Sequence, residues 1–236
     1  MDMLTIALSK GKLFHPILKL FHKAGYGTSG LTAETRKLLL PCLKKDVTFL
    51  IVRSSDVPTY VEYGAADVGI VGKDVLLEQD SDVYEPLDLK IGACRISVAV
   101  LQGQESRDSL SSKIRVATKY PKVTERYFNQ RGIPVEIIKL YGSVELAPIV
   151  RLSDRIVDLV ETGNTLKAHN LIETEVIAES TARLIVNRAS LKLKHRTLTA
   201  LIDALRRCVK TNSRNFSRSR GRLKSLGKAG GSVRTR

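Results

Sequence analysis

The part of the chain best suited to chemistry is a short polar turn that follows an apolar run. Ile156–Val160 is typical of a buried strand, and the turn Glu161–Thr165 follows it directly. Gly163 allows a positive φ or a close approach of the backbone. The N–H groups after it, together with the hydroxyls of Thr162 and Thr165, suit a phosphate monoester. The alternative is an ordinary strand followed by a helix that Thr162 caps.

Two carboxylates stand close to the start of this turn. Asp158 lies within the apolar run, and Glu161 comes directly after it. Carboxylates at this place can bind ribose hydroxyls or a Mg²⁺ ion that a pyrophosphate group holds. Two acids followed by a Thr-Gly-Asn-Thr turn therefore favour a site for a phosphorylated ribose such as phosphoribosyl pyrophosphate.

A second polar turn follows the predicted strand Leu4–Leu8. It consists of Ser9, Lys10, Gly11 and Lys12. Ligands of open α/β sheets bind at the carboxyl ends of the strands, so Lys12 is placed to reach a polyphosphate. The alternative is a solvated turn between a strand and a helix.

Two further segments place acidic residues at predicted helix starts. Asp56 precedes a helix that Pro58 begins, and Asp74 stands at the start of another helix. This pattern is typical of a ligand-binding lobe whose helix N-termini face a cleft, although helix caps and tight packing explain it equally well. Glu145 follows a Gly-Ser turn in the first turn of a helix, where capping is the alternative to catalysis.

The elements that position these turns predict an α/β protein with largely parallel sheets, because short β-branched runs alternate with helical patterns. Residues Asp88–Arg95 indicate a crossing between two lobes. The predicted strands are Leu4–Leu8, Thr48–Val52, Val68–Val71, Ile96–Leu101, Ile114–Ala117, Val135–Ile138, Ile156–Val160 and Ala182–Asn187. The predicted helices are Pro16–Ala24, Pro58–Tyr63, Pro121–Gln130 and Leu198–Lys210.

Composition argues against several classes of protein. The chain has 236 residues and a mean hydropathy of -0.07, and no run reaches the roughly 18 apolar residues of a membrane span. Three Cys residues form no CxxC pair, and the four His residues show no metal-ligand spacing. We therefore expect neither a disulfide framework nor a protein-built metal site. Because the N-terminal residues lack a secretory pattern, we expect the cytoplasm as the compartment.

Much of the net charge of +15 lies near the C-terminus. Val209–Arg236 contains nine basic residues and no acidic ones, which leaves +6 for the rest of the chain. The segment has few apolar residues, so we expect it to be disordered. It is either an incidental extension or a patch for RNA or a membrane surface. Phe216 is its only aromatic residue for stacking on a base, so we favour the extension and expect no nucleic-acid or membrane partner.

In this order, the segments resemble the short form of the ATP phosphoribosyltransferase family. The resemblance covers residues 3–208, and its most specific parts are RSSDVPTYVEYGAAD at 53–67 and the turn ETGNT at 161–165. It extends to ALSKGKL at 7–13, DLKIGAC at 88–94, KIRVATKYPKV at 113–123, IKLYGSVELAP at 138–148 and ARLIVN at 182–187.

The resemblance implies a fold and a reaction. The implied fold has two lobes like those of type II periplasmic binding proteins, with residues 1–92 and 172–208 in one lobe and 93–171 in the other, and a disordered basic tail over 209–236. The implied reaction is attack of N1 of the adenine of ATP on the anomeric carbon of phosphoribosyl pyrophosphate, with release of diphosphate. Mg²⁺ is the implied cofactor, held mainly by substrate phosphates and not by the protein alone.

The resemblance also assigns roles to residues. Lys12 and Arg36 are the implied catalytic residues, because positive charge beside the departing pyrophosphate lowers the barrier. The implied binding residues for phosphoribosyl pyrophosphate are Asp158, Glu161, Thr162, Gly163, Asn164 and Thr165. The implied ATP-binding residues are Lys10, Gly11, Arg53, Asp56, Asp74, Tyr120 and Glu145.

A separate regulatory subunit, resembling the catalytic core of histidyl-tRNA synthetase, is the implied partner. We expect no regulatory domain of its own in the segment after Cys208, because 28 residues of this composition cannot build a core. The chain departs from the family pattern at Lys12, where Arg is usual, and at Arg151 and Asn170, where Gly is usual. The alternatives to an enzyme are a non-catalytic solute-binding module with the same two-lobed fold and an RNA-binding protein.

Overall fold

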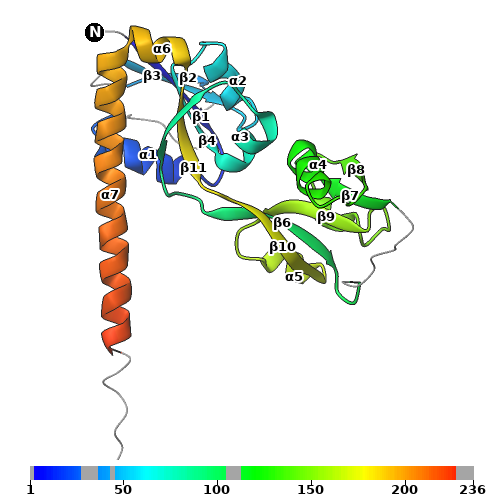
Figure 1. Cartoon of the computed structure of the whole chain (residues 1–236). Coiled ribbons are helices and arrows are strands. Elements are labelled where there is room, and N and C mark those ends of the chain that lie inside the picture. Colours follow the sequence, from blue (N-terminus) through cyan, green and yellow to red (C-terminus); the bar gives the residue numbers. More distant parts are fainter. Residues whose placement is uncertain (1–2, 28–36, 43–45, 105–112, 227–236) are drawn as a thin grey trace, which may run out of the picture.

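The computed structural model describes residues 3–27, 37–42, 46–104 and 113–226, with side chains as far as residue 211. The chain forms two α/β lobes that are joined by two neighbouring connections (Figure 1). Each lobe has its own sheet and its own apolar core. The two-lobed α/β fold predicted from the sequence is confirmed.

The first lobe contains a six-stranded sheet. Its order is β2 (Leu39–Pro41), β3 (Val47–Val52), β1 (Leu4–Ser9), β4 (Val68–Gly72), β11 (Ala182–Val186) and β5 (Tyr84–Asp88). Strand β1 pairs in parallel with both β3 and β4. The helices of this lobe are α1 (Phe14–Lys23), α2 (Val57–Glu62), α3 (Lys73–Gln79), α6 (Arg188–Leu193) and α7 (His195–Leu226).

The second lobe contains a five-stranded sheet. Its order is β10 (Leu171–Ser180), β6 (Cys94–Leu101), β9 (Arg155–Val160), β7 (Ile114–Thr118) and β8 (Val135–Lys139). Helix α4 (Pro121–Asn129) packs on one face, while the 3₁₀ turn η1 (Val144–Leu146) and helix α5 (Asn164–Ala168) contribute to the cluster on the other. The phosphate-type turn therefore lies on the face of the sheet opposite α4.

The expectation of largely parallel sheets is wrong for the strands that connect the lobes. β11 runs antiparallel to β4 and β5, and β6 runs antiparallel to β9 and β10. The physical reason is the route of the chain: it enters the second lobe through β5 and β6 and returns beside that path through β10 and β11. An outgoing and a returning strand that lie side by side must run in opposite directions.

The return crossing also lies later in the chain than expected. Leu171–Ser180 pairs with β6, so most of the segment 172–180 belongs to the second sheet, and the chain crosses back between Ser180 and Ala182. The sequence patterns did not predict three strands, β2, β5 and β10. Strands β2 and β5 each contain a proline, which suits only an edge strand, and both lie at sheet edges.

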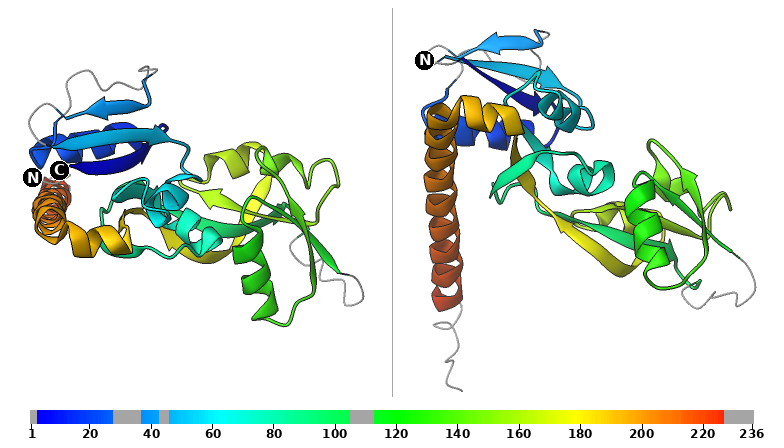
Figure 2. Two further views of the ribbon diagram at one scale, coloured as in Figure 1. Left: turned by 90° about the horizontal axis from the view of Figure 1, so that it is seen from above. Right: turned by 45° about the horizontal axis from the view of Figure 1, so that its top comes forward.

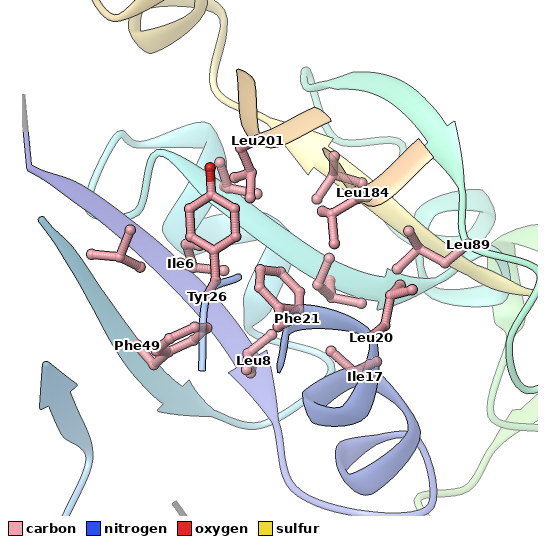
Figure 3. Packing of buried hydrophobic residues seen from close by; sticks show 14 of the residues in the cluster. Ile6, Leu8, Ile17, Leu20, Phe21, Tyr26, Phe49, Leu89, Leu184 and Leu201 are labelled. Atoms are coloured by element: carbon pink, nitrogen blue, oxygen red, sulfur yellow. The ribbon is translucent and has the colours of Figure 1, made fainter. Parts of the chain in front are cut away.

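The core of the first lobe forms between the sheet, α1 and α7 (Figure 3). Phe21 of α1 packs edge-to-face against Phe49 of β3, with ring centroids 5.6 Å apart, and against Tyr26. Leu201 of α7 belongs to the same cluster, and α7 contacts α1 directly. This packing fixes α1, and with it the turn Ser9–Lys12 that precedes the helix.

Helix α7 is longer than predicted. It runs from His195 to Leu226 and leaves the body of the first lobe after its first half (Figures 1 and 2). The helix therefore includes much of the segment 209–236 that we expected to be disordered, and residues 227–236 lie outside the described part of the chain. The segment up to Leu226 contains no proline, and Gly227 follows the last helical residue, a usual position for a helix stop.

Two departures from the family pattern fall at unusual backbone positions. Arg151 has a φ of 61° and Asn170 a φ of 54°, both in the left-handed region that favours glycine. Asn tolerates this region, whereas an Arg there is strained by roughly 1–2 kcal/mol. The Arg151 side chain is exposed, so the cost lies in the backbone and not in a clash.

Within the described residues, no helix combines the length and the apolar character that crossing a membrane requires.

Candidate active site

A cavity of about 490 Å³ lies between the two lobes. Both lobes and the connections between them contribute to its wall, as expected for a ligand site at the carboxyl ends of strands. Its lining includes Ser9, Lys10, Gly11, Lys12, Ser54 and Asp74 from the first lobe, Gly92 from the connection between β5 and β6, and Cys94, Lys119, Leu159, Glu161 and Ser180 from the second lobe.

The turn after β1 and the turn after β9 face each other across this cavity. Lys12 Nζ donates to Glu161 Oε2 at 2.9 Å, which joins two residues 149 positions apart. Both side chains are largely exposed, so the pair adds little to stability. A phosphate group of a ligand can therefore replace Glu161 as the partner of Lys12 with little loss of free energy.

Gly163 has a φ of 79°, and a Cβ placed there would meet nothing within 4 Å. The turn around it is open toward solvent, since Glu161, Thr162, Asn164 and Thr165 all have substantial exposure. Thr162 does not cap the following helix strongly: its hydroxyl accepts the Asn164 N–H at 3.4 Å. Because α5 has only five residues, its dipole is small, and the turn's own N–H groups and hydroxyls are the features that suit a phosphate.

Asp158 lies beside this turn on β9. Burial raises the pKa of its carboxyl, and the nearby Glu145 raises it further, while the Leu159 N–H and Lys119 act in the opposite direction. The structure therefore brings Glu145 near the ribose-binding candidates. The side chain of Ser143, the residue before η1, does not cap this turn.

Asp74 and Tyr120 lie together at the join of the lobes, and both are buried. Tyr120 donates its hydroxyl to Asp74 Oδ2 at 3.0 Å, and Ser180 donates to Asp74 Oδ1 at 2.7 Å. Burial, followed by the charge of Asp74, raises the pKa of Tyr120. Both carboxylate oxygens of Asp74 are thus engaged within the protein, although the residue also lines the cavity.

The remaining candidates are less central. Arg53 and Asp56 are exposed residues of the segment before α2, where only Ser54 lines the cavity. Asp56 does not cap α2 through its side chain; Ser55 donates to its carboxylate instead. Arg36 lies outside the described residues.

Sequence reasoning missed three polar side chains of the cavity. Lys119 comes directly after β7, so the rule that identified Lys12 at the end of β1 would also have identified it. Cys94 and Ser180 lie where β6 and β10 meet, and they could not be found because β10 was not predicted. Lys119 adds a third lysine to a cavity that Lys10 and Lys12 already border.

Two α/β lobes on a pair of connecting strands define a two-lobed α/β protein, and the lysines around the cavity between the lobes suit an anionic ligand. Comparison with known proteins gives the particular family. A family model described as ATP phosphoribosyltransferase matches residues 53–207. The chain therefore belongs to the ATP phosphoribosyltransferase family.

Relatives and a solved structure agree. An ATP phosphoribosyltransferase of Geobacter metallireducens is 56% identical over 210 residues, which are 88% of this chain and 99% of the relative. One of Pseudomonas fluorescens is 48% identical over 213 residues, 90% of this chain and 100% of the relative. The structure described as an ATP phosphoribosyl transferase (HisG:HisZ) complex from Thermotoga maritima matches with a TM-score of 0.78 and 35% identity, covering 89% of this chain and 100% of that chain.

The activity is that of a pentosyltransferase. The enzyme transfers the phosphoribosyl group of phosphoribosyl pyrophosphate to N1 of the adenine of ATP and releases diphosphate, the first step of histidine biosynthesis. The resemblance found in the sequence is confirmed.

Proposed function

We propose that this transfer takes place in the cavity between the lobes, with phosphoribosyl pyrophosphate held by the second lobe. The observation that carries the proposal is the pairing of Lys12 with Glu161, since it brings the predicted phosphate-type turn and the lysine turn to one cavity. The 5′-phosphate would bind at Thr162–Thr165, and Asp158 and Glu161 would bind the ribose hydroxyls.

Charge is the main contribution that the protein makes to this reaction. The bond from the anomeric carbon to the pyrophosphate oxygen breaks as adenine N1 attacks from the opposite face, so negative charge grows on the leaving group. Lys12 and Lys119 border the cavity from opposite lobes and would stabilise that charge. Arg36 is proposed for the same role from the family resemblance alone.

The ATP side of the cavity belongs to the first lobe in this proposal. Lys10 and Gly11 border the cavity directly, and Arg53 and Asp56 flank Ser54, which does the same. Asp74 and Tyr120 would act on ATP indirectly, by holding the two lobes together, because their polar atoms bind each other. Glu145 would act through its neighbour Asp158.

Mg²⁺ is the proposed cofactor. Among the described residues, no group of three or more His, Cys, Asp or Glu side chains is placed to hold a metal ion. The donor set fits an ion held chiefly by substrate phosphates, with Asp158 or Glu161 as a single protein contact. When bound, Mg²⁺ would neutralise pyrophosphate charge.

We further propose a partner and a compartment. The Thermotoga maritima structure is described as a HisG:HisZ complex, and this supports a separate regulatory subunit for the present chain, one that resembles the catalytic core of histidyl-tRNA synthetase. The activity in histidine biosynthesis is in keeping with the cytoplasm. Activity measured with and without the regulatory subunit of the same organism tests the first point, and equal rates would contradict it.

The phosphate turn is tested by replacing Gly163 with alanine. The new methyl group points into the open space where the phosphate would approach, so kcat/KM for phosphoribosyl pyrophosphate should fall by about two orders of magnitude, the loss expected for one preorganised contact. Gly132→Ala is the matched control, because Gly132 in the same lobe has a φ of 67° and equally open surroundings.

Both alanine variants should lose similar stability, roughly 1–2 kcal/mol, since both place a Cβ in the left-handed region. Only Gly163→Ala should lose activity and affinity for phosphoribosyl pyrophosphate in equilibrium binding. If the two variants keep the same kcat/KM, the phosphate does not bind at this turn.

A further inference from the structure

We propose that Arg95 is a positioning residue for the phosphate turn, and this inference rests on the proposed function of that turn. Arg95 lies on β6 directly opposite Val160, the last residue of β9. Its Nη1 donates to the main-chain carbonyl of Glu161, with the two atoms 3.4 Å apart. The guanidinium therefore touches the backbone at the residue where the strand becomes the turn.

The guanidinium is itself held in place by a carboxylate. Glu173 of β10 accepts hydrogen bonds from Nε and Nη2 of Arg95, and Ser97 donates to the same carboxylate at 2.7 Å. The bond from Arg95 is the main reason why the pKa of Glu173 is lowered. A planar guanidinium with two of its donors fixed has one orientation, so its third nitrogen points to one place.

The same lobe contains a second arginine–carboxylate pair, at the other end of β9. Arg115 donates from Nε and Nη2 to Asp154, and its Nη1 donates to the carbonyl of Arg151 at 3.2 Å. That pair lies just before β9 begins, whereas Arg95 lies where β9 ends. If these arginine–carboxylate pairs only joined strands, loss of Arg95 and loss of Arg115 would affect the enzyme equally. The proposal predicts that only the loss of Arg95 lowers activity.

The physical reason is the demand that phosphate binding makes on the backbone. The N–H groups of the turn must point at the ligand before it arrives, and a displacement of about 1 Å can cost on the order of 100-fold in rate. Glu161 is the first residue of the turn, and its side chain also meets Lys12. Fixing its carbonyl fixes the peptide plane from which the turn starts.

The test compares Arg95→Met with Arg115→Met. We expect Arg95→Met to lower kcat/KM for phosphoribosyl pyrophosphate by about tenfold to 100-fold while the KM for ATP stays within about twofold. Arg115→Met should keep both parameters within about twofold. Arg95→Lys keeps the charge but not the fork, so it should recover little activity.

Two measurements separate positioning from a general loss of stability. Hydrogen exchange of the peptide covering residues 161–168, in the enzyme without substrate, should be faster in Arg95→Met and unchanged in Arg115→Met. Glu173→Gln should resemble Arg95→Met, and the double variant should be no worse than Arg95→Met alone, because the two residues act as one unit.

The proposal is overturned if Arg95→Met and Arg115→Met lose activity equally, or if the exchange of residues 161–168 does not change in Arg95→Met. These outcomes differ from failure of the proposed function. An inactive Gly163→Ala enzyme beside a fully active Arg95→Met enzyme removes only the positioning role. A fully active Gly163→Ala enzyme removes the phosphate turn itself, and the exchange measurement still reports whether Arg95 orders that segment.

Discussion

At the scale of one residue, Asp158 is an example of a side chain that suits ligand binding but lowers the stability of the fold. It stands within an apolar strand, next to the turn proposed to hold phosphate. Burial raises the pKa of its carboxyl, so the fold disfavours the charged form that ribose hydroxyls would bind. Buried carboxylates with a shifted pKa are concentrated at functional sites.

Asp158→Asn should make the protein more stable and the enzyme less active. A raised carboxyl pKa means that the stability conferred by the protonated form is present at low pH and lost as pH rises through the folded-state pKa. At pH 7 the amide therefore removes an unfavourable charge, and urea unfolding should show a larger free energy of unfolding than in the wild type. The kcat/KM for phosphoribosyl pyrophosphate should fall by at least about tenfold, the factor for one hydrogen bond to a charged group.

The stability gain should shrink as pH is lowered toward the ordinary aspartate value of 3.8, because the wild-type carboxyl then becomes neutral too. Asp88→Asn is the control with the opposite sign. Burial acts to raise the pKa of Asp88, but hydrogen bonds from Lys90 and Thr181 outweigh it and lower the pKa. This variant should lose stability at pH 7. A loss of stability at pH 7 in Asp158→Asn as well would contradict the assignment.

At the scale of elements, helix α3 and the start of α4 connect the two lobes. Tyr120, just before α4, donates to Asp74 in the first turn of α3. Glu78 of α3 accepts the N–H groups of Lys122 and Val123, each at 3.1 Å, and so satisfies two of the free donors at the beginning of α4. Both contacts cross from one lobe to the other.

Tyr120→Phe tests whether this tyrosine serves the join or the nucleotide. Because its hydroxyl is engaged with Asp74, we expect the free energy of unfolding to fall by about 1.5–3 kcal/mol, the usual size for a hydrogen bond to a charged group. The KM for ATP should stay within about twofold. X-ray scattering of the free enzyme should show a larger radius of gyration, since one contact between the lobes is lost.

Tyr127→Phe is the matched control for this measurement. Tyr127 lies on α4 itself and, like Tyr120, donates to a carboxylate, that of Glu175, but Tyr127 and Glu175 both belong to the second lobe. It should lose stability without a change in the radius of gyration. A large increase in the KM for ATP in Tyr120→Phe, with unchanged dimensions, would show that the hydroxyl binds the nucleotide instead.

At the scale of the whole molecule, α7 divides into a packed part and a projecting part. Leu198, Leu201 and Leu205 are fully buried in the core of the first lobe, and Val209 is the last of the described α7 side chains in that cluster. Beyond it the helix extends away from the body (Figure 2). The first lobe therefore needs the first half of α7 for its core.

Deletion of residues 213–236 should leave kcat unchanged and shift the melting temperature by less than about 4 °C, which corresponds to roughly 1 kcal/mol for a chain of this size. Deletion from residue 203 onward is the contrasting truncation within the same helix, since it removes Leu205 and Val209 from the core. That shorter chain should lose several kcal/mol, about 2–5 for each large buried side chain. A marked loss of activity in the 213–236 deletion would give the projecting part a role.

Patterns within short stretches of the sequence were enough to predict most local elements and the positions of the polar turns. Period-two apolar runs, prolines at helix starts and the glycine turns each act over a few residues, so β1, β3, β4, α4 and the turn after β9 were found where they are. The same local rules failed at β10, whose ten residues include three glutamates that strands usually avoid. Two of these glutamates bind Arg95 and Tyr127, partners that only the folded chain brings near.

Which turns meet in space depends on the folded chain as a whole. Lys12 and Glu161 are 149 residues apart, Asp74 and Ser180 are 106 apart, and Arg95 and Glu173 are 78 apart. No periodic pattern connects such distant positions, because their contact depends on how the chain crosses between the lobes and returns beside itself. The return through β10 and β11 places Ser180 beside Asp74 and Glu173 beside Arg95. It thereby brings the turns after β1 and β9, which the sequence predicted separately, to the lining of one cavity.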